Sequence, residues 1–84
     1  MTLAQLKYVI TVAETKSMNE AAKQLFLSQP SLSETIKELE QEIGLQIFLR
    51  SNRSIVITPE GEEFLGYARQ VTEQFGLLQS RYID

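Results

Sequence analysis

The 84-residue chain contains no cysteine and no histidine, and it has only two prolines and four glycines. Without cysteine there is no disulfide, thiolate zinc site or cysteine nucleophile. Without histidine the chain lacks the commonest general base and the commonest ligand of transition metals. No apolar run approaches the ~20 residues that span a membrane, and the N-terminus shows no signal-peptide pattern. These absences argue against an enzyme and predict a cytoplasmic domain with no metal, cofactor or catalytic residue.

An excess of positive charge, which is usual in a nucleic-acid-binding domain, is also missing. Lys and Arg number 8 against 11 Asp and Glu, which gives a net charge of −3. The segment 59–84 accounts for all of it, because Arg69 and Arg81 are outnumbered there by five acidic residues. The first 58 residues are therefore neutral overall, which leaves room for a small basic patch.

Three helix starts divide the first 44 residues. Thr2 with Gln5, and Ser17 with Glu20, have the spacing of a capping box. The third start is an N-cap serine two residues before a proline, and its helix ends at a glycine. Apolar residues at helical spacing then predict helices over about residues 3–15, 18–26 and 29–43. The positions expected to face inward are Leu3, Leu6, Val9 or Ile10, Ala13, Ala21, Ala22, Leu25, Leu32, Ile36, Leu39 and Ile43.

The residue pattern changes after the third helix. Leu45, Ile47 and Leu49 alternate with the residues between them. A polar turn at 51–54 and a β-branched run at 55–57 follow. Alternation, turn and β-branched run together predict a two-stranded hairpin.

A final helix follows the hairpin. Thr58 is its expected N-cap and Pro59 its first residue, and the helix should continue to about residue 82. The tight connection between the second and third helices is typical of a helix-turn-helix. The hairpin turns this into a mainly α, winged helix-turn-helix over residues 1–58, followed by a long helix in 59–84. Topology alone is equally compatible with a small α+β bundle that binds no ligand.

Three motifs lie between Ser17 and Gly61. They are Ser17-Met-Asn-Glu-Ala-Ala22-Lys-Gln-Leu25; Ser28-Gln29-Pro30-Ser31-Leu32-Ser33 with Ile36, Lys37, Leu39 and Glu40; and Gly44-Leu45 with Ile47, Phe48, Arg50, Arg53, Ile57, Thr58, Pro59 and Gly61. In combination they resemble the N-terminal DNA-binding domain of LysR-type transcriptional regulators. The resemblance implies sequence-specific binding of double-stranded DNA by a homodimer. It also implies that this chain is part of a longer regulator whose absent C-terminal part senses a small-molecule effector.

The helix expected over 29–43 would be the recognition helix, whose N-terminal residues meet base edges in the major groove. The resemblance makes Gln29, Ser33 and Lys37 the best candidates for these contacts. Glu34 is either a solvated surface charge or an acceptor for the amino group of cytosine. The complete set of expected DNA-binding residues is Ser17, Ser28, Gln29, Pro30, Ser31, Ser33, Glu34, Lys37, Arg50 and Arg53.

Arg50 directly precedes the polar turn of the hairpin, and Arg53 lies within it. Such residues lie along a phosphate or in a narrow minor groove, or else form weak surface ion pairs. The resemblance favours DNA contact for Arg53, whereas Arg50 could equally tie the strand to the helix before it, with Glu40 as its partner. Ser17 and Ser28 are first of all helix caps, and each could also contact a phosphate at its helix N-terminus.

The last helix carries an apolar seam with the 4-3 spacing of a heptad repeat. About 24 residues make a helix of ~36 Å, which overhangs a domain of ~12 Å radius of gyration. The seam either packs on the first helix or pairs with a second copy. The resemblance implies an antiparallel homodimer that binds an interrupted inverted repeat. The seam, and hence the expected dimer interface, consists of Phe64, Ala68, Val71, Phe75, Leu78 and Tyr82.

One other function stays open. The small number of Lys and Arg residues is compatible with a winged-helix module that binds protein and no longer binds DNA. Binding to duplex DNA that weakens steeply with salt separates the two functions, since only DNA binding releases counterions.

Overall fold

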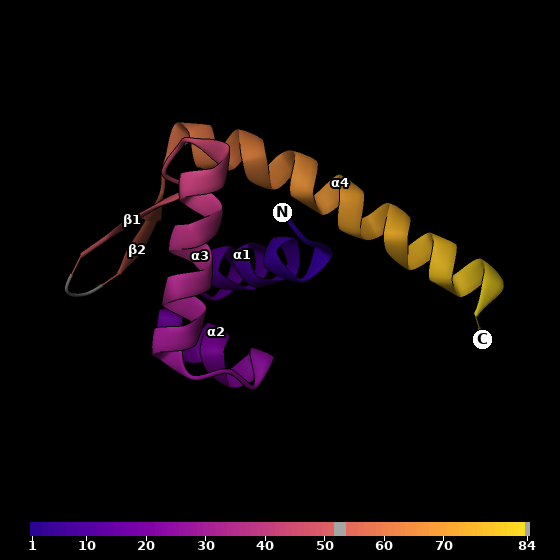
Figure 1. Ribbon diagram of the computed structural model, residues 1–84, viewed down its shortest axis with the longest axis horizontal. Coiled ribbons are helices and arrows are strands. Elements are labelled where there is room, and N and C mark those ends of the chain that lie inside the picture. The colour runs from indigo at the N-terminus through magenta and orange to yellow at the C-terminus, as the bar shows by residue number, and fades with distance from the viewer. Residues whose placement is uncertain (52–53, 84) are drawn as a thin grey trace.

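The computed structural model describes residues 1–51 and 54–83. Its elements are α1 (Leu3–Thr15), α2 (Met18–Leu25), α3 (Gln29–Ile43), β1 (Phe48–Arg50), β2 (Ile55–Ile57) and α4 (Pro59–Tyr82). The predicted winged helix-turn-helix is confirmed, and each helix lies within one residue of its expected bounds. In Figure 1 the hairpin and the far end of α4 lie at opposite ends of the molecule, whose longest dimension is 43 Å.

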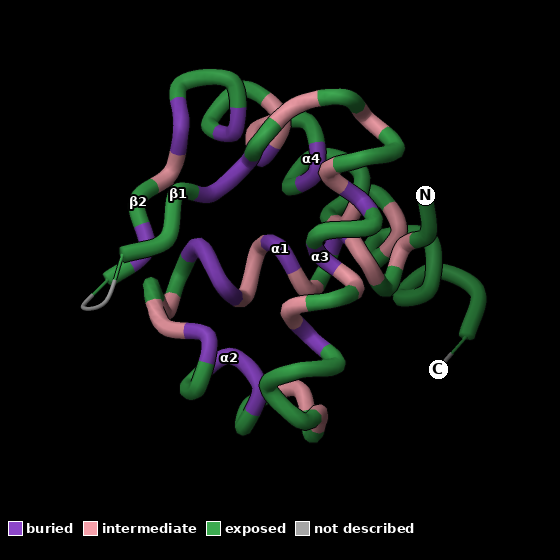
Figure 2. Tube along the Cα trace, turned by 60° about the vertical axis from the view of Figure 1, so that its left-hand side comes forward, coloured by how far each residue is buried: buried purple, intermediate pink, exposed green. Residues whose placement is uncertain are grey.

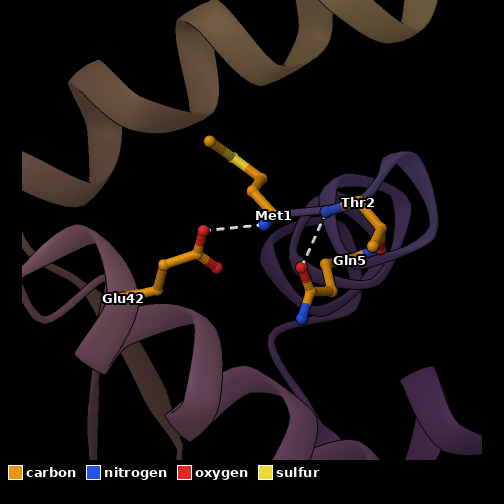
Figure 3. Close-up of polar contacts among 4 residues, drawn as sticks. All are labelled: Met1, Thr2, Gln5 and Glu42. Carbon is orange, nitrogen blue, oxygen red and sulfur yellow. Dashed lines mark hydrogen bonds and ion pairs between the residues drawn. The ribbon is translucent and has the colours of Figure 1, made fainter.

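The helices begin where their caps are. Gln5 N–H donates to Thr2 Oγ1 (3.1 Å) and Thr2 N–H donates to Gln5 Oε1 (2.8 Å), which completes the first capping box (Figure 3). Ser17 Oγ accepts from Glu20 N–H (3.1 Å), but the return bond predicted from Glu20 is wrong. The backbone N–H of Ser17 instead donates to Thr15 Oγ1 (3.4 Å), so it has a partner without the carboxylate.

The two ends of α3 are also fixed. Ser31 N–H donates to Ser28 Oγ (3.2 Å) at the start of the helix. At its end Gly44 has the left-handed φ of 76° predicted for a C-cap. The α-amino group of Met1 lies 2.7 Å from Glu42 Oε2, which joins the start of α1 to the last turn of α3 (Figure 3).

The core lies between α1, α2, α3, the hairpin and the first half of α4, as the buried residues in Figure 2 show. Within α1, Val9 and Val12 are completely buried and Ile10 only partly, so the stripe runs through Val9. The burial of Val12 was not predicted. The buried apolar residues are Leu6, Val9, Val12, Ala13, Met18, Ala21, Ala22, Leu32, Ile36, Leu39, Ile47, Phe48, Ile55, Leu65 and Ala68.

The predicted hairpin is confirmed, and its first strand begins later than the alternating run of residues. β1 starts only at Phe48, which pairs with Ile57 in an antiparallel register. Phe48 is 1% exposed and Leu49 is 49% exposed, so Phe48 faces the core and Leu49 faces solvent. Residues 45–47 precede the strand, and the period of two begins only at Phe48.

A cluster of hydrogen bonds joins the hairpin to α4. Thr58 Oγ1 donates to Gln46 O (2.5 Å) and accepts from Gly61 N–H (2.9 Å), while Thr58 N–H donates to Ile47 O (2.9 Å). A Cβ on Gly61 would lie only 2.9 Å from Ile47 Cα, so the close approach requires glycine. The start of α4 is thereby fixed to the segment that leads into β1.

The second half of α4 extends away from the other helices (Figure 1). Most of its apolar residues are exposed, with exposed fractions of 51% at Val71, 57% at Leu77 and Leu78 and 74% at Tyr82, whereas Phe75 is half-buried. Over the described ranges, no helix combines the length and apolar character needed to cross a membrane.

Candidate nucleic-acid interface

One face of α3 is free of the core. The opposite face buries Leu32, Ile36 and Leu39 almost completely, and this packing holds the helix in place. Ser33 is half-buried at the edge between the two faces. The exposed face carries the predicted residues Gln29, Pro30, Ser31, Glu34 and Lys37. A helix anchored on one side and polar on the other can enter a major groove without rearrangement.

Both predicted cap serines do act as caps. Ser28 Oγ accepts from Ser31 N–H and also donates to Ser31 Oγ (2.9 Å). Ser17 Oγ accepts from Glu20 N–H. Ser28 is exposed and Ser17 half-buried, so each hydroxyl lies at a helix N-terminus near the surface.

The partners of Arg50 and Glu40 differ from those predicted. Arg50 Nη1 donates to Ser33 Oγ (2.5 Å). Glu40 Oε2 accepts from the backbone N–H groups of Ile47 (2.8 Å) and Phe48 (3.1 Å). Glu40 therefore joins α3 to the start of β1 through the backbone. The predicted Glu40–Arg50 pair is wrong, whereas the predicted tie from Arg50 to the third helix is confirmed, with Ser33 as the partner.

A polar cleft of about 270 Å³ lies beside this face, between the starts of α2 and α3 and the hairpin. Two basic side chains, Lys16 and Arg50, line it. Sequence reasoning singled out Arg50 but missed Lys16, because no sequence pattern indicates that the end of α1 lies beside the hairpin. The lining residues are Lys16, Ser17, Met18, Asn19, Gln29, Arg50, Ser51, Ser54 and Ile55.

Glu34 is exposed, and it forms no ion pair with any residue the structure describes. Arg53 lies outside the described residues. The described part of the chain also contains no group of three or more acidic residues placed to hold a metal ion.

The predicted seam of α4 divides into two parts. Phe64 is partly buried against the core and Ala68 is buried, so the first part packs within the chain, mainly on α1. Lys7 Nζ lies 5.8 Å from the centroid of the Phe75 ring, which extends this contact between α1 and α4. Leu65 is fully buried although it is not on the seam.

An open apolar groove of about 380 Å³ runs between α1 and α4. Tyr67 and Val71 form its outer side and are 66% and 51% exposed. Farther along the helix, Leu78 and Tyr82 are exposed as well. Packing on the first helix therefore holds for the first part of the seam, while pairing of its exposed outer part with a second copy stays a prediction. The groove is lined by Met1, Thr2, Leu3, Leu6, Phe64, Tyr67, Ala68 and Val71.

Solved structures with this fold include domains bound to DNA. The DNA-binding domain of BenM in complex with benA site 1 DNA superimposes with a TM-score of 0.91 at 37% identity, covering 96% of this chain and 91% of that one. The DNA-binding domain of CbnR in complex with DNA gives a TM-score of 0.91 at 41% identity, with 96% and 93% covered.

Sequence comparisons agree with the structural ones. YxjO, an HTH-type transcriptional regulator of Bacillus subtilis strain 168, is 42% identical over 71 residues, which are 84% of this chain and 24% of YxjO. The chain spans 22% to 26% of the length of such curated relatives. The family model described as "Bacterial regulatory helix-turn-helix protein, lysR family" matches residues 3–62. Because this match includes α1, α2, α3, both strands and the start of α4, the chain belongs to the lysR family of bacterial regulatory helix-turn-helix proteins.

Proposed function

We propose that this chain is a sequence-specific, double-stranded-DNA-binding domain that acts as a homodimer in the cytoplasm. The observation that carries the proposal is the superposition, over 96% of the chain, on two family domains solved on DNA. The exposed polar face of α3 and the neighbouring polar cleft, with its two basic side chains, supply the surface that such binding requires.

In the proposed complex α3 lies in the major groove. The Gln29 amide, in the first turn of α3, pairs with an adenine edge, while Ser31 and Ser33 reach bases or phosphates. Lys37 contacts a phosphate farther along the helix. Glu34 selects cytosine if it lies at a base and otherwise stays solvated.

The hairpin supplies the backbone contacts. Arg50 and Arg53 lie on phosphates or in the minor groove beside the site. Ser17 and Ser28 each place a capped helix N-terminus at the DNA backbone, where the helix dipole favours an anion. These contacts fix the position of α3 on the duplex but carry little sequence information.

The two parts of the chain have different proposed roles. Residues 1–58 bind DNA, and residues 59–84 form a linker helix that pairs two copies. A dimer presents two recognition helices, so its site is an inverted repeat whose half-sites are separated by whole helical turns. Any effector would bind to the part of the longer regulator that lies beyond these 84 residues.

A duplex selection with a salt series tests this function. Duplexes enriched from a random pool should contain an inverted repeat, and their affinity should fall steeply as salt rises. Gln29→Ala should reduce discrimination between enriched and random duplex by about 1–3 kcal/mol. Gln41→Ala, at the exposed far end of α3, is the matched control and should leave discrimination unchanged.

The competing function gives the opposite result. A protein-binding winged helix would enrich no sequence and would show no salt-dependent affinity for duplex DNA. The net charge of −3 is the observation that favours this alternative, and the same selection decides between the two.

A further inference from the structure

We propose that Lys16, together with Arg50, holds a DNA backbone phosphate in the polar cleft between α2 and the hairpin. The proposal rests on the proposed DNA-binding function and adds to it a specific contact. Lys16 lies between α1 and α2, outside the recognition helix, and no motif discussed above includes it.

The backbone at Lys16 is the first observation. Its φ of 54° and ψ of 30° place it in the left-handed region, which is unfavourable for every L residue because of its Cβ. Its N–H donates to Val12 O (2.8 Å) and closes the end of α1. Glycine would adopt this backbone without that penalty, so the fold does not require a lysine here.

The side chain is the second observation. Lys16 is exposed and forms no ion pair with any described residue. Lys23, by contrast, lies 3.8 Å from Glu20 on its own helix. The charge of Lys16 is therefore not balanced by a described carboxylate, so the ammonium group is available to an anion.

The composition of the cleft is the third observation. Its lining contains two basic side chains, several neutral hydrogen-bonding ones and no carboxylate. This is unusual in a chain with three more acidic than basic residues. Both clefts beside Lys37 include Glu40 in their lining, which makes them less suited to an anion.

The geometry of the cleft fits a phosphate of a bound duplex. Lys16 is the C-cap of α1 and Arg50 lies in β1, so the two cations approach from different elements. Arg50 already donates to Ser33 on α3, which leaves its other N–H groups for a phosphate. Gln29, which also lines the cleft, would place this phosphate next to a base contact.

Charge-removing variants test the contact on the duplex selected above. Lys16→Gln should weaken binding several-fold for selected and random duplexes alike, and it should lower the slope of log affinity against log salt by about one. Lys23→Gln removes the same charge from α2 outside the cleft and should change affinity less than twofold. Equal effects of the two variants would overturn the proposal, as would a loss confined to selected duplexes, which would indicate a base contact.

A second variant separates binding from folding. Lys16→Gly removes the left-handed strain together with the charge, so its Tm should stay equal or rise while its DNA affinity falls as in Lys16→Gln. A Lys16→Gly protein with wild-type affinity would overturn the phosphate contact. If the wild-type domain itself shows no salt-dependent duplex binding, the proposed function fails with it. If the wild-type domain binds duplex DNA with the expected salt dependence and the Lys16 variants bind equally well, the Lys16 inference fails and the proposed function stands.

Discussion

A single carboxylate, that of Glu40, holds the end of α3 to the start of the hairpin. It accepts hydrogen bonds from the N–H groups of two buried residues, Ile47 and Phe48. Glu40→Ala leaves both donors without this partner, which should lower the free energy of unfolding by about 1–3 kcal/mol. Urea unfolding measures the change.

Glu38→Ala is the control for this variant. Glu38 is exposed on the same helix, so its removal should change stability by no more than about 0.5 kcal/mol. Equal losses for the two variants would mean that the Glu40 bonds contribute nothing specific.

The Ser33–Arg50 hydrogen bond makes two proposed DNA contacts interdependent. Ser33→Ala should release Arg50 and so weaken binding to every duplex, in addition to any loss at a base. The affinities of Ser33→Ala, Arg50→Ala and the double variant form a double-mutant cycle. Because the residues are in contact, we expect a coupling energy of about 0.5–3 kcal/mol. Strictly additive losses would show that the two side chains act separately on DNA.

At the level of elements, α4 contains one glycine that cannot carry a side chain, Gly61, and one that can, Gly76. A Cβ at Gly61 would collide with the backbone of Ile47, whereas one at Gly76 would meet nothing within 4 Å. Gly61→Ala should therefore destabilise the fold by at least ~1 kcal/mol, since backbone must shift. Gly76→Ala should stabilise the helix by about 0.5–1 kcal/mol. Thermal unfolding of the two variants should thus shift in opposite directions, and a parallel shift would contradict this account.

Helices were predictable here because their signals are local. Thr2, Ser28, Thr58 and Gly44 each mark a boundary through bonds to residues only a few positions away. The start of β1 and the direction of Leu49 were not predictable in this way, because they depend on where pairing with β2 begins, which is a non-local property. Within the candidate site, too, local features could be predicted from the sequence and non-local contacts could not.

The exposed face of α3 follows from helical periodicity, so residues such as Lys37 were identified correctly as exposed. The Ser33–Arg50 bond and the cleft at Lys16 join segments far apart in the sequence. No pattern within a single helix or strand contains that information. The Glu40 partners were missed for a related reason, because backbone N–H groups carry no sequence signature.

At the level of the whole molecule, the exposed half of α4 should pair two copies. Leu78 is 57% exposed in the single chain, so Leu78→Glu costs the monomer little. In a packed dimer interface it would bury an unpaired charge at a cost of several kcal/mol, roughly enough to separate a marginal dimer. Sedimentation should show a monomer with unchanged helical circular dichroism and weaker binding to a two-half-site duplex.

Ser80→Glu is the matched control, because it adds the same charge about 160° round the helix from Leu78 and should leave the dimer intact. Phe75 is a poorer position for this test, since Lys7 lies beside its ring and would compensate a new carboxylate. A Leu78→Glu protein that remains dimeric with full DNA affinity would show that α4 does not form the interface.

The division of α4 into a buried and an exposed half also affects its amide hydrogen exchange. Leu65 and Ala68 are held against the core, whereas the turns around Leu77 and Tyr82 have little tertiary support. Local opening requires less free energy where buried contacts are few, so in the monomer exchange should accelerate steadily toward residue 83. Pairing of two copies would slow exchange in the outer turns alone, and the dimer dissociation constant could be read from the concentration at which that protection appears.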